Sequence, residues 1–325
     1  MDDLKPIDIV ICWVDGNDPD HRAKRRQYEP SSSVNLMHEA TDETRFANVG
    51  EIYYSIASIL KFAPFIRKIW IVTDNQKPTL LDEFAKAGLC AENFIEIVDH
   101  RTIFRGYEEY LPTFNSLTIE SMIWRIPGLS EQFVYFNDDV LLCREVLPSD
   151  WFHNGLPQIY ATRQKRFRPT KLQRLKHRIF PSLMQHDYPP FYRMQENAAA
   201  LISKAKTFWR GAHVPHALRR STFERYFQDH DNVLRNIIRH RFRGRDQAWP
   251  MALAHHIEIL RNGVAPYPSF GVIYINARKK GLSGLNRQNF KLGTHRSMTI
   301  QSLDGATDRV RTSVINQLTR KYRDF

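Results

Sequence analysis

The sequence predicts an α/β fold with a doubly wound, mostly parallel sheet flanked by helices. Three short apolar runs, at residues 7–14, 69–73 and 133–140, are rich in β-branched and aromatic residues and are typical of buried strands. Residues 51–60 carry apolar side chains at helical spacing, so the first two strands and this helix form a right-handed βαβ unit. The 325 residues are enough to bury a sizeable core. The doubly wound class follows from this alternation.

The first predicted strand ends in a tight polar turn, DGNDP, at residues 15–19. Gly16 allows a ligand to approach the backbone closely, and Asp15 could contact the ribose or base of a nucleotide. Trp13, just before the turn, could stack on a ligand or belong to the core. An ordinary strand-to-loop turn is the alternative interpretation of the cluster.

Residues 21–44 are polar and include a basic cluster. They predict a mobile loop with a short helix that orders over substrate. The helix at residues 51–60 follows, packs one face on the sheet, and is ended by Pro64.

A third strand is predicted at residues 94–98, and His100 after it is interpreted as a local hydrogen-bonding residue. The next helix is predicted at residues 117–125, with Ser116 as its N-cap. Because helix N-termini bind anions through free N–H groups, Asn115 and Ser116 could contact a phosphate. Capping alone would also explain both residues.

The strand at residues 133–140 runs into the polar triplet Asn137, Asp138 and Asp139. Open α/β sheets place their chemistry where strands leave the sheet. Adjacent carboxylates are hard oxygen ligands for a divalent cation, which could bridge to the phosphates of a nucleotide. A solvated turn is the alternative, because Asn and Asp are common turn residues.

Residues 163–178 are strongly basic. The basic side chains are Arg163, Lys165, Arg166, Arg168, Lys171, Arg174, Lys176 and Arg178. Leu172, Leu175 and Ile179 add a weak apolar stripe, which predicts a surface helix that rests on the domain with its basic face outward. Such a density of like charge favours contact with a polyanion or a membrane surface over a merely solvated face.

The second half of the chain predicts three helices and a strand, at residues 197–209, 223–238, 249–260 and 267–275. His213 and His216 flank Pro215, which excludes the helical i, i+4 arrangement of paired zinc-binding histidines. One imidazole could instead act as a general base or donate to a phosphoryl oxygen. Arg243 and Arg245 follow, and arginine is suited to bidentate phosphate binding.

The composition indicates an acidic partner. The formal net charge is +12 and the isoelectric point is near 9.6, which suits a nucleotide, a polyanionic polymer, nucleic acid or an anionic membrane. No RNP-like strand, zinc-ligand spacing or helix-turn-helix pattern accompanies the charge, which argues against nucleic acid. Three cysteines without CxxC spacing, a start unlike a secretory signal and the lack of a bilayer-spanning apolar run predict a cytoplasmic protein, at most peripheral to a membrane.

Several motifs together identify a family resemblance. IDIVICWVDGNDP occupies residues 7–19, and a second group runs from Glu51 through YYSIASILKFAPFIRKIWIVTDNQKP, DH, LPTFNSLTIES and RIPGLSEQFVYFNDDVLL to Leu142. A third group is HVPH followed by RFRGRD. These resemble the Stealth family of sugar-1-phosphate transferases, which includes bacterial capsular polysaccharide phosphotransferases and the enzyme that marks lysosomal hydrolases with GlcNAc-1-phosphate. The family's fourth region usually carries an Asn-Asp pair, of which this sequence keeps only Asp304.

The resemblance implies a Rossmann-like, GT-A-like sheet that binds a UDP-sugar, with Mg²⁺ or Mn²⁺ as cofactor. By motif match, the nucleotide would be held by Trp13, Val14, Asp15, Gly16 and Asn75. The metal would be faced by Asp138 and Asp139, which with Asn115, His213 and Arg243 form the implied catalytic set. Whether His213, Asp138 or another carboxylate removes the acceptor proton stays open.

The resemblance also implies a reaction and a setting. A hydroxyl of a growing, anionic capsule or exopolysaccharide glycan attacks the phosphorus next to the sugar, and UMP leaves; an N-acetylhexosamine 1-phosphate is the expected group transferred. The alternative is a metal-dependent glycosyltransferase that releases UDP. We expect a bacterial enzyme in the cytoplasm, peripheral to the inner membrane or its capsule-assembly machinery, with its oligomeric state open.

The expected organisation is one catalytic domain over residues 1–325. It comprises a Rossmann-like core at residues 5–150, a basic helical insertion at residues 155–190, and a helical, C-terminal part at residues 195–325 that completes the active site.

Overall fold

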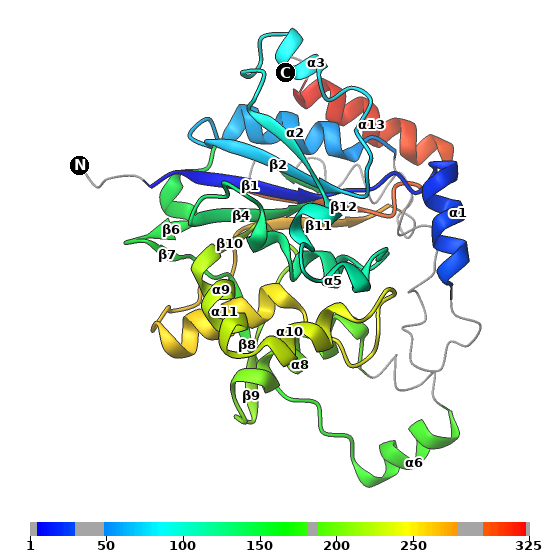
Figure 1. Ribbon diagram of the computed structural model, residues 1–325, viewed down its shortest axis with the longest axis vertical. Helices are drawn as coiled ribbons and strands as arrows, with labels where there is room; N and C mark the ends of the chain where they lie inside the picture. The colour runs from blue at the N-terminus through cyan, green and yellow to red at the C-terminus, as the bar shows by residue number, and fades with distance from the viewer. Residues whose placement is uncertain (1–4, 30–48, 181–187, 278–294, 323–325) are drawn as a thin grey trace.

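A five-stranded sheet forms the centre of the computed structural model, which describes residues 5–29, 49–180, 188–277 and 295–322 (Figure 1). The strand order is β10-β4-β1-β2-β3, and all neighbours are parallel except the antiparallel pair β10 and β4. The strands are β1 (Ile7–Cys12), β2 (Lys68–Thr73), β3 (Ile95–Asp99), β4 (Gln132–Asn137) and β10 (His216–Arg219). The predicted α/β class with a mostly parallel sheet is confirmed.

β1 suits the centre of the sheet because its sequence, IDIVIC, is apolar except for Asp8 and is buried on both faces. It pairs with β2 on one side and β4 on the other, and the register sets Cys12 opposite both Val72 and Asn137. Alternate side chains enter two different cores, since Ile9 packs on one face of the sheet and Val10 on the other. The register therefore fixes which strand ends become neighbours.

Helices cover both faces of the sheet (Figure 1). One face is covered by α2 (Glu51–Phe62) and α13 (Asp308–Tyr322). The other is covered by α5 (Ser116–Glu120), α8 (Pro190–Ile202), α9 (Arg220–Asp229), α10 (Asp231–Ile238) and α11 (Pro250–Arg261). The helix predicted at residues 51–60 is confirmed as α2, whose apolar stripe faces the sheet.

A second sheet continues from the end of β4. It contains β5 (Val140–Leu142), β12 (Ser297–Gln301) and β11 (Val272–Asn276), with β12 antiparallel to β5 and parallel to β11. Ser55 and Ser58 of α2 fix β5, because Ser55 Oγ donates to the Val140 carbonyl at 2.8 Å and the Leu142 N–H donates to Ser58 Oγ at 3.0 Å. The strand predicted at residues 267–275 is confirmed only over residues 272–275, which belong to β11.

Further described elements lie outside the two sheets. They include α1 (Pro19–Tyr28), α3 (Glu83–Lys86), α4 (His100–Ile103), the hairpin of β6 (Phe152–His153) and β7 (Leu156–Pro157), and 3₁₀ turns at Glu108–Tyr110, Ile123–Arg125 and Pro148–Asp150. α1 is the short helix predicted within residues 21–44; residues 30–48, most of that predicted loop, lie outside the described residues. None of the helices described is both long and apolar enough to cross a bilayer.

The helix predicted at residues 117–125 is shorter than expected. α5 ends at Glu120 and is followed by a 3₁₀ turn. The predicted cap is also wrong, because the Asn115 side chain accepts from the Leu117 N–H at 3.2 Å and Ser116 is the first helical residue. Asn and Ser are similarly good N-caps, so sequence alone could not choose between adjacent candidates.

Two other predicted helices are wrong in their extent. The one at residues 223–238 is broken at His230, where ψ is 50° and α9 gives way to α10. The one at residues 197–209 is α8 followed by β9 (Thr207–Gly211), which pairs antiparallel with β8 (Ala161–Lys165). Pairing with a strand that is distant in sequence overrides the local helical pattern.

The basic segment at residues 163–178 is not one helix packed on the domain. Its first residues belong to β8, and its last to α6 (Lys171–Ile179). The expectation that its apolar stripe rests on the domain is wrong, because Leu172, Leu175 and Ile179 are 62%, 56% and 60% exposed. Figure 1 shows α6 standing apart from the other labelled elements at the lower edge of the molecule.

Removing the buried carboxylate of β1 is expected to destabilise the sheet. Asp8 is fully buried and accepts from Arg67 Nε at 2.8 Å, Trp70 Nε1 at 3.0 Å and the Ser130 N–H at 2.8 Å. Asp8→Ala leaves these donors without their acceptor, so we expect the free energy of unfolding to fall by about 3–5 kcal/mol. Urea denaturation measures it; Asp82→Ala, at an exposed surface ion pair, should change it by less than about 1 kcal/mol.

Candidate active site

The carboxyl ends of β1 to β4 lie at one edge of the sheet, and polar residues follow each of them. In spatial order from β4 to β3, these are residues 137–139, 13–16, 74–76 and 99–100. The register sets Cys12 of β1 opposite Asn137 of β4, and Thr73 of β2 opposite Asp99 of β3. Segments that are separate in the sequence therefore become neighbours where α/β sheets bind ligands.

The two carboxylates after β4 are crowded by like charge. Burial, followed by the charges of Asp139 and Glu51, raises the pKa of Asp138 well above its ordinary value. Burial also raises the pKa of Glu51, with smaller contributions from Asp139 and Asp304. Glu51 begins α2 and was not among the predicted site residues. The position of Glu51 at the start of a helix does not indicate that it lies near Asp138 and Asp139. These residues come close because α2 packs on β5.

His213 contacts the polar triplet through one ring nitrogen. Its Nε2 lies 3.2 Å from Asp139 Oδ1 and 3.1 Å from Asn137 Nδ2. With a proton on Nε2 the ring donates to Asp139, and without it the ring accepts from the Asn137 amide. Burial lowers the pKa of His213, but Asp139 outweighs this effect and the net shift is upward. The His213 and Asp139 side chains are 22% and 20% exposed, so both remain accessible to a ligand.

β12 holds both of these residues by their backbones. The Ile300 N–H donates to the Asp139 carbonyl at 3.0 Å, and Thr299 Oγ1 donates to the His213 carbonyl at 3.2 Å. The sequence motifs single out only Asp304 in this segment, and its charge contributes to the raised pKa of Glu51. The supporting role of Thr299 was missed, because strand pairing between such distant residues leaves no local sequence signal.

Asp138 and Asp139 have the donor chemistry that a divalent cation requires. Mg²⁺ usually takes one or two carboxylates and completes its shell with water and substrate phosphates. Burial, and after it the repulsion from Asp139 and Glu51, raises the pKa of Asp138, and a bound cation would relieve that repulsion. No cluster of three or more His, Cys, Asp or Glu side chains within the described ranges forms a complete cation site. The residues thus fit a cation that is shared with a phosphorylated ligand.

The turn after β1 is fixed by Gln76. The Asp15 N–H donates to Gln76 Oε1 at 2.9 Å, and Gln76 Nε2 donates to the Asp15 carbonyl and to Asp18 Oδ2, both at 3.0 Å. Asn75, the predicted nucleotide contact, instead has a left-handed φ of 53° and donates its N–H to Asp99 Oδ2 at 2.7 Å. Gln76 was missed, although it follows β2 at the same edge.

The other predicted nucleotide residues differ in exposure. Trp13 is buried in the apolar core, which favours the core interpretation over stacking on a ligand. Val14 is half-buried, Gly16 is buried, and Asp15 is half-buried at the sheet edge. Of these four residues, Asp15 has the polar side chain, and it is partly exposed.

Arg243 contacts the start of α5 and acts electrostatically on His213. Its Nη2 donates to Ser116 Oγ at 2.6 Å, and its charge acts on both Glu120 and His213. Burial raises the pKa of Glu120, and Arg243 opposes that shift. The charges of Arg243 and Asp139 both act on His213, although His213 lies 74 residues and Arg243 104 residues after Asp139 in the sequence.

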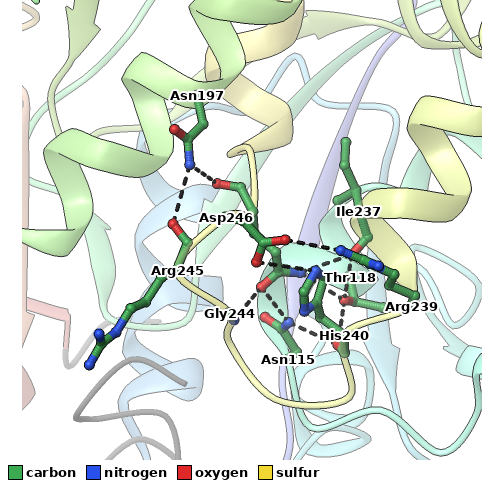
Figure 2. A network of polar contacts seen from close by, with 10 residues as sticks. Asn115, Thr118, Asn197, Ile237, Arg239, His240, Gly244, Arg245 and Asp246 are labelled. Carbon is green, nitrogen blue, oxygen red and sulfur yellow. Dashed lines mark hydrogen bonds and ion pairs between the residues drawn. The ribbon is translucent and has the colours of Figure 1, made fainter. Parts of the chain in front are cut away.

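A network of hydrogen bonds fixes the loop that carries Arg243 (Figure 2). Asn115 Nδ2 donates to the His240 carbonyl at 2.9 Å and to Gln247 Oε1 at 2.8 Å. Gln247 Oε1 also accepts from the Gly244 N–H at 2.9 Å. Asn115 is buried, and its side chain is engaged on both sides. The structure therefore gives Asn115 a positioning role toward Arg243.

The far end of the same loop is tied to α8. Asn197 Nδ2 donates to the Gln247 carbonyl at 3.0 Å and to the Arg245 carbonyl at 3.3 Å (Figure 2). Gly244 is needed at its position, because an added Cβ would lie 2.7 Å from the ring of His240. α5 and α8 thus hold the loop from two sides.

Replacing Gln247 by alanine is expected to destabilise this loop. The Gly244 N–H and the Ile237 carbonyl would lose their partners in a buried region, and a cavity would remain. We expect the free energy of unfolding to fall by about 2–4 kcal/mol. Urea denaturation measures the change, and Gln317→Ala on the half-buried face of α13 serves as the matched control. Equal denaturation midpoints for the Gln247→Ala variant and the parent would contradict the role of the network.

Two family models match this chain. They are described as "Stealth protein CR1, conserved region 1", which matches residues 5–33, and "Stealth protein CR2, conserved region 2", which matches residues 45–159. The two regions contain the turn after β1, the strand ends of β2 and β3, and the Asp138–Asp139 pair.

Curated proteins and solved structures give further similarities. The chain is 41% identical over 185 residues to the capsular polysaccharide phosphotransferase cps1A of Actinobacillus pleuropneumoniae, covering 56% of this chain and 47% of that protein. It is 32% identical over 279 residues to the exopolysaccharide phosphotransferase SCO2594 of Streptomyces coelicolor, covering 83% and 41%. The chain spans less than half the length of these relatives.

Among solved structures, apo mouse xyloside xylosyltransferase 1 is 10% identical, with a TM-score of 0.39, covering 90% of this chain and 98% of that one. This likeness is too weak to bear on function. The two conserved regions and the identity to the phosphotransferases agree with the motifs read from the sequence: the chain contains matches to the first two conserved regions of the Stealth family and is similar to phosphotransferases.

Proposed function

We propose that this chain is a capsular or exopolysaccharide phosphotransferase. It moves a sugar 1-phosphate, with an N-acetylhexosamine 1-phosphate as the expected group, from a UDP-sugar to a hydroxyl of a growing glycan and releases UMP. The observation that carries the proposal is the grouping of two adjacent carboxylates with His213 and Arg243 at the carboxyl edge of the sheet. The names of the similar proteins support the reaction class.

The proposed reaction is a phosphoryl transfer. The acceptor hydroxyl oxygen bonds to the phosphorus that carries the sugar, and the bond from that phosphorus to the bridging oxygen breaks as UMP leaves. The proton of the hydroxyl passes to a base at the site. Such a reaction needs positioning and charge neutralisation more than covalent chemistry from the protein.

Each group at the sheet edge has a proposed task. The turn at Asp15 binds the nucleotide, and Asp138 with Asp139 would hold Mg²⁺ or Mn²⁺. The cation, when bound, would neutralise charge on the phosphates. Arg243 donates to oxygens of the transferred phosphoryl group, for which its planar fork is suited. His213 holds or moves a proton at Nε2; His213, Asp138 and another carboxylate all remain possible bases for the acceptor hydroxyl.

The nucleotide released decides the reaction. Purified protein is incubated with Mg²⁺, a capsule-fragment acceptor and each common UDP-sugar in turn, and the products are separated chromatographically. UMP that appears only with acceptor present is the expected result and names the donor. UDP would make the chain a metal-dependent glycosyltransferase, since the same carboxylates and donor would serve that reaction, and would overturn the proposal.

We also propose where the reaction takes place. The formal net charge of +12 suits both an anionic glycan acceptor and the anionic inner face of the cytoplasmic membrane, where such a glycan would be assembled. The enzyme would be cytoplasmic and in peripheral contact with that membrane or with its capsule-assembly machinery. Extraction of the native protein from cell membranes by high salt, without detergent, would support this location.

A further inference from the structure

α6 differs from every other helix described in the structure by how its apolar side chains are placed. Leu172, Leu175 and Ile179 lie within an arc of about 60° on one face of the helix. All three are more than half exposed, as is Phe180 at the C-cap. This face of α6 is thus largely open, and α6 stands clear of the sheet and its flanking helices (Figure 1). The helix thus has an unpartnered apolar stripe.

The sequence of α6, KLQRLKHRI, contains four Lys and Arg residues and no acidic residue. Lys171 and Lys176 flank the stripe on its two sides, and Arg174 and Arg178 lie farther round the helix; all four are exposed. None of them forms an ion pair with a described residue, and the sequence has no Asp or Glu between Asp150 and Asp187. The charge around the stripe therefore has one sign.

This segment is built to be a helix even though little packs on it. Thr170 and Gln173 form a capping box, in which the Gln173 N–H donates to Thr170 Oγ1 at 3.2 Å and the Thr170 N–H donates to Gln173 Oε1 at 2.9 Å. An isolated helix of nine residues is marginal in water. Burial of its apolar stripe in an apolar environment outside the protein would supply the stabilisation that the isolated helix lacks.

We propose that α6 docks on an anionic lipid bilayer, with its leucines and Ile179 at the headgroup and acyl boundary and its basic side chains among the headgroups. An apolar stripe bordered by Lys and Arg and free of acids is the pattern of an interfacial helix. A soluble polyanion would satisfy the charges but would leave the stripe in water. This inference gives the proposed membrane location a contact surface; it does not depend on which nucleotide the enzyme releases.

The test is co-sedimentation of the full chain with sucrose-loaded vesicles at low and physiological salt. Vesicles of phosphatidylcholine alone should bind the protein weakly. Vesicles in which phosphatidylglycerol replaces part of the phosphatidylcholine should bind the protein at low salt and release it as salt rises. Arg174→Gln/Arg178→Gln should lower the partition coefficient by about fivefold per side chain. Leu172→Ser/Leu175→Ser should lower it by about tenfold or more.

Matched controls carry the same chemical changes elsewhere. Arg309→Gln/Arg320→Gln on α13 removes two exposed charges, and Leu147→Ser/Leu260→Ser replaces two leucines that are 56% and 51% exposed. Both controls should bind within about twofold of the parent, because they lie outside the proposed contact.

Two results would overturn the proposal. Equal binding of the Leu172→Ser/Leu175→Ser variant and the parent would show that only charge matters and that α6 is a polyanion surface. Equal binding to both vesicle types would remove the role of the basic residues. Because UMP release is measured separately in vesicle-free solution, failure of the docking and failure of the phosphotransferase assignment can be told apart.

Discussion

Replacement of Asp139 by alanine is expected to lower acceptor-dependent UMP release by about a thousandfold or more while the protein stays folded. The substitution removes one of the two carboxylates that would hold the cation, and it removes the partner of His213 Nε2 at 3.2 Å. The backbone at this position is held by the Ile300 N–H, which the substitution leaves intact. Loss of activity without loss of fold would mark Asp139 as functional.

The stability of the same variant provides a second measurement. Asp139 is one of the charges that raise the pKa of Asp138, so its removal relieves repulsion within the folded protein. We expect the free energy of unfolding to stay within about 1 kcal/mol of the parent. Asp82→Ala removes an exposed carboxylate from a surface ion pair and should leave UMP release unchanged. Full activity of Asp139→Ala would remove this carboxylate from the mechanism.

Arg243→Lys is expected to lower kcat for UMP release by about a hundredfold. The guanidinium donates through Nη2 to Ser116 Oγ at 2.6 Å, and the proposed mechanism requires its planar fork to keep a fixed orientation toward the transferred phosphoryl group. A lysine ammonium is a point charge on a flexible stem and cannot keep both contacts in a fixed geometry. The loss should appear mainly in kcat, because the contact to the transferred group strengthens in the transition state.

The matched control for this prediction is Arg235→Lys on α10. Arg235 is exposed and pairs with Asp231 and Glu109, so its replacement by lysine should leave kcat within about twofold of the parent. Activity of Arg243→Lys within a few-fold of the parent would count against a role for the guanidinium fork. Circular dichroism of both variants verifies that the helices are retained.

The central sheet could be predicted because each of its parallel strands is encoded locally. β1, β2 and β4 are continuous apolar runs, and each ends in polar residues that mark where the strand leaves the sheet. The neighbours β3 and α2 follow from the same periodicity. The pair Asp138 and Asp139 could be singled out for the same reason, since a strand end in an α/β fold is a position with known chemical use.

The helical half was predicted less well, because its elements depend on distant partners. The sequence of β9 favours a helix, and its strand conformation follows only from its pairing with β8. No proline or glycine marks the helix break at His230. α6 was expected to bury its stripe on the domain, yet an amphipathic pattern states only that a face avoids water, not what covers it.

The sequence by itself determined the fold class, the strand ends that carry polar residues, and the motifs that match two conserved regions of the Stealth family. Only the tertiary structure decided how the candidate site is supported: β12 holds Asp139 and His213, Gln76 fixes the turn at Asp15, and Asn115 with Gln247 fixes the Arg243 loop. The physical reason is the distance along the sequence over which each kind of interaction acts. Strand and helix patterns arise between residues a few positions apart, whereas these hydrogen bonds join residues that only the packing of the whole chain makes neighbours.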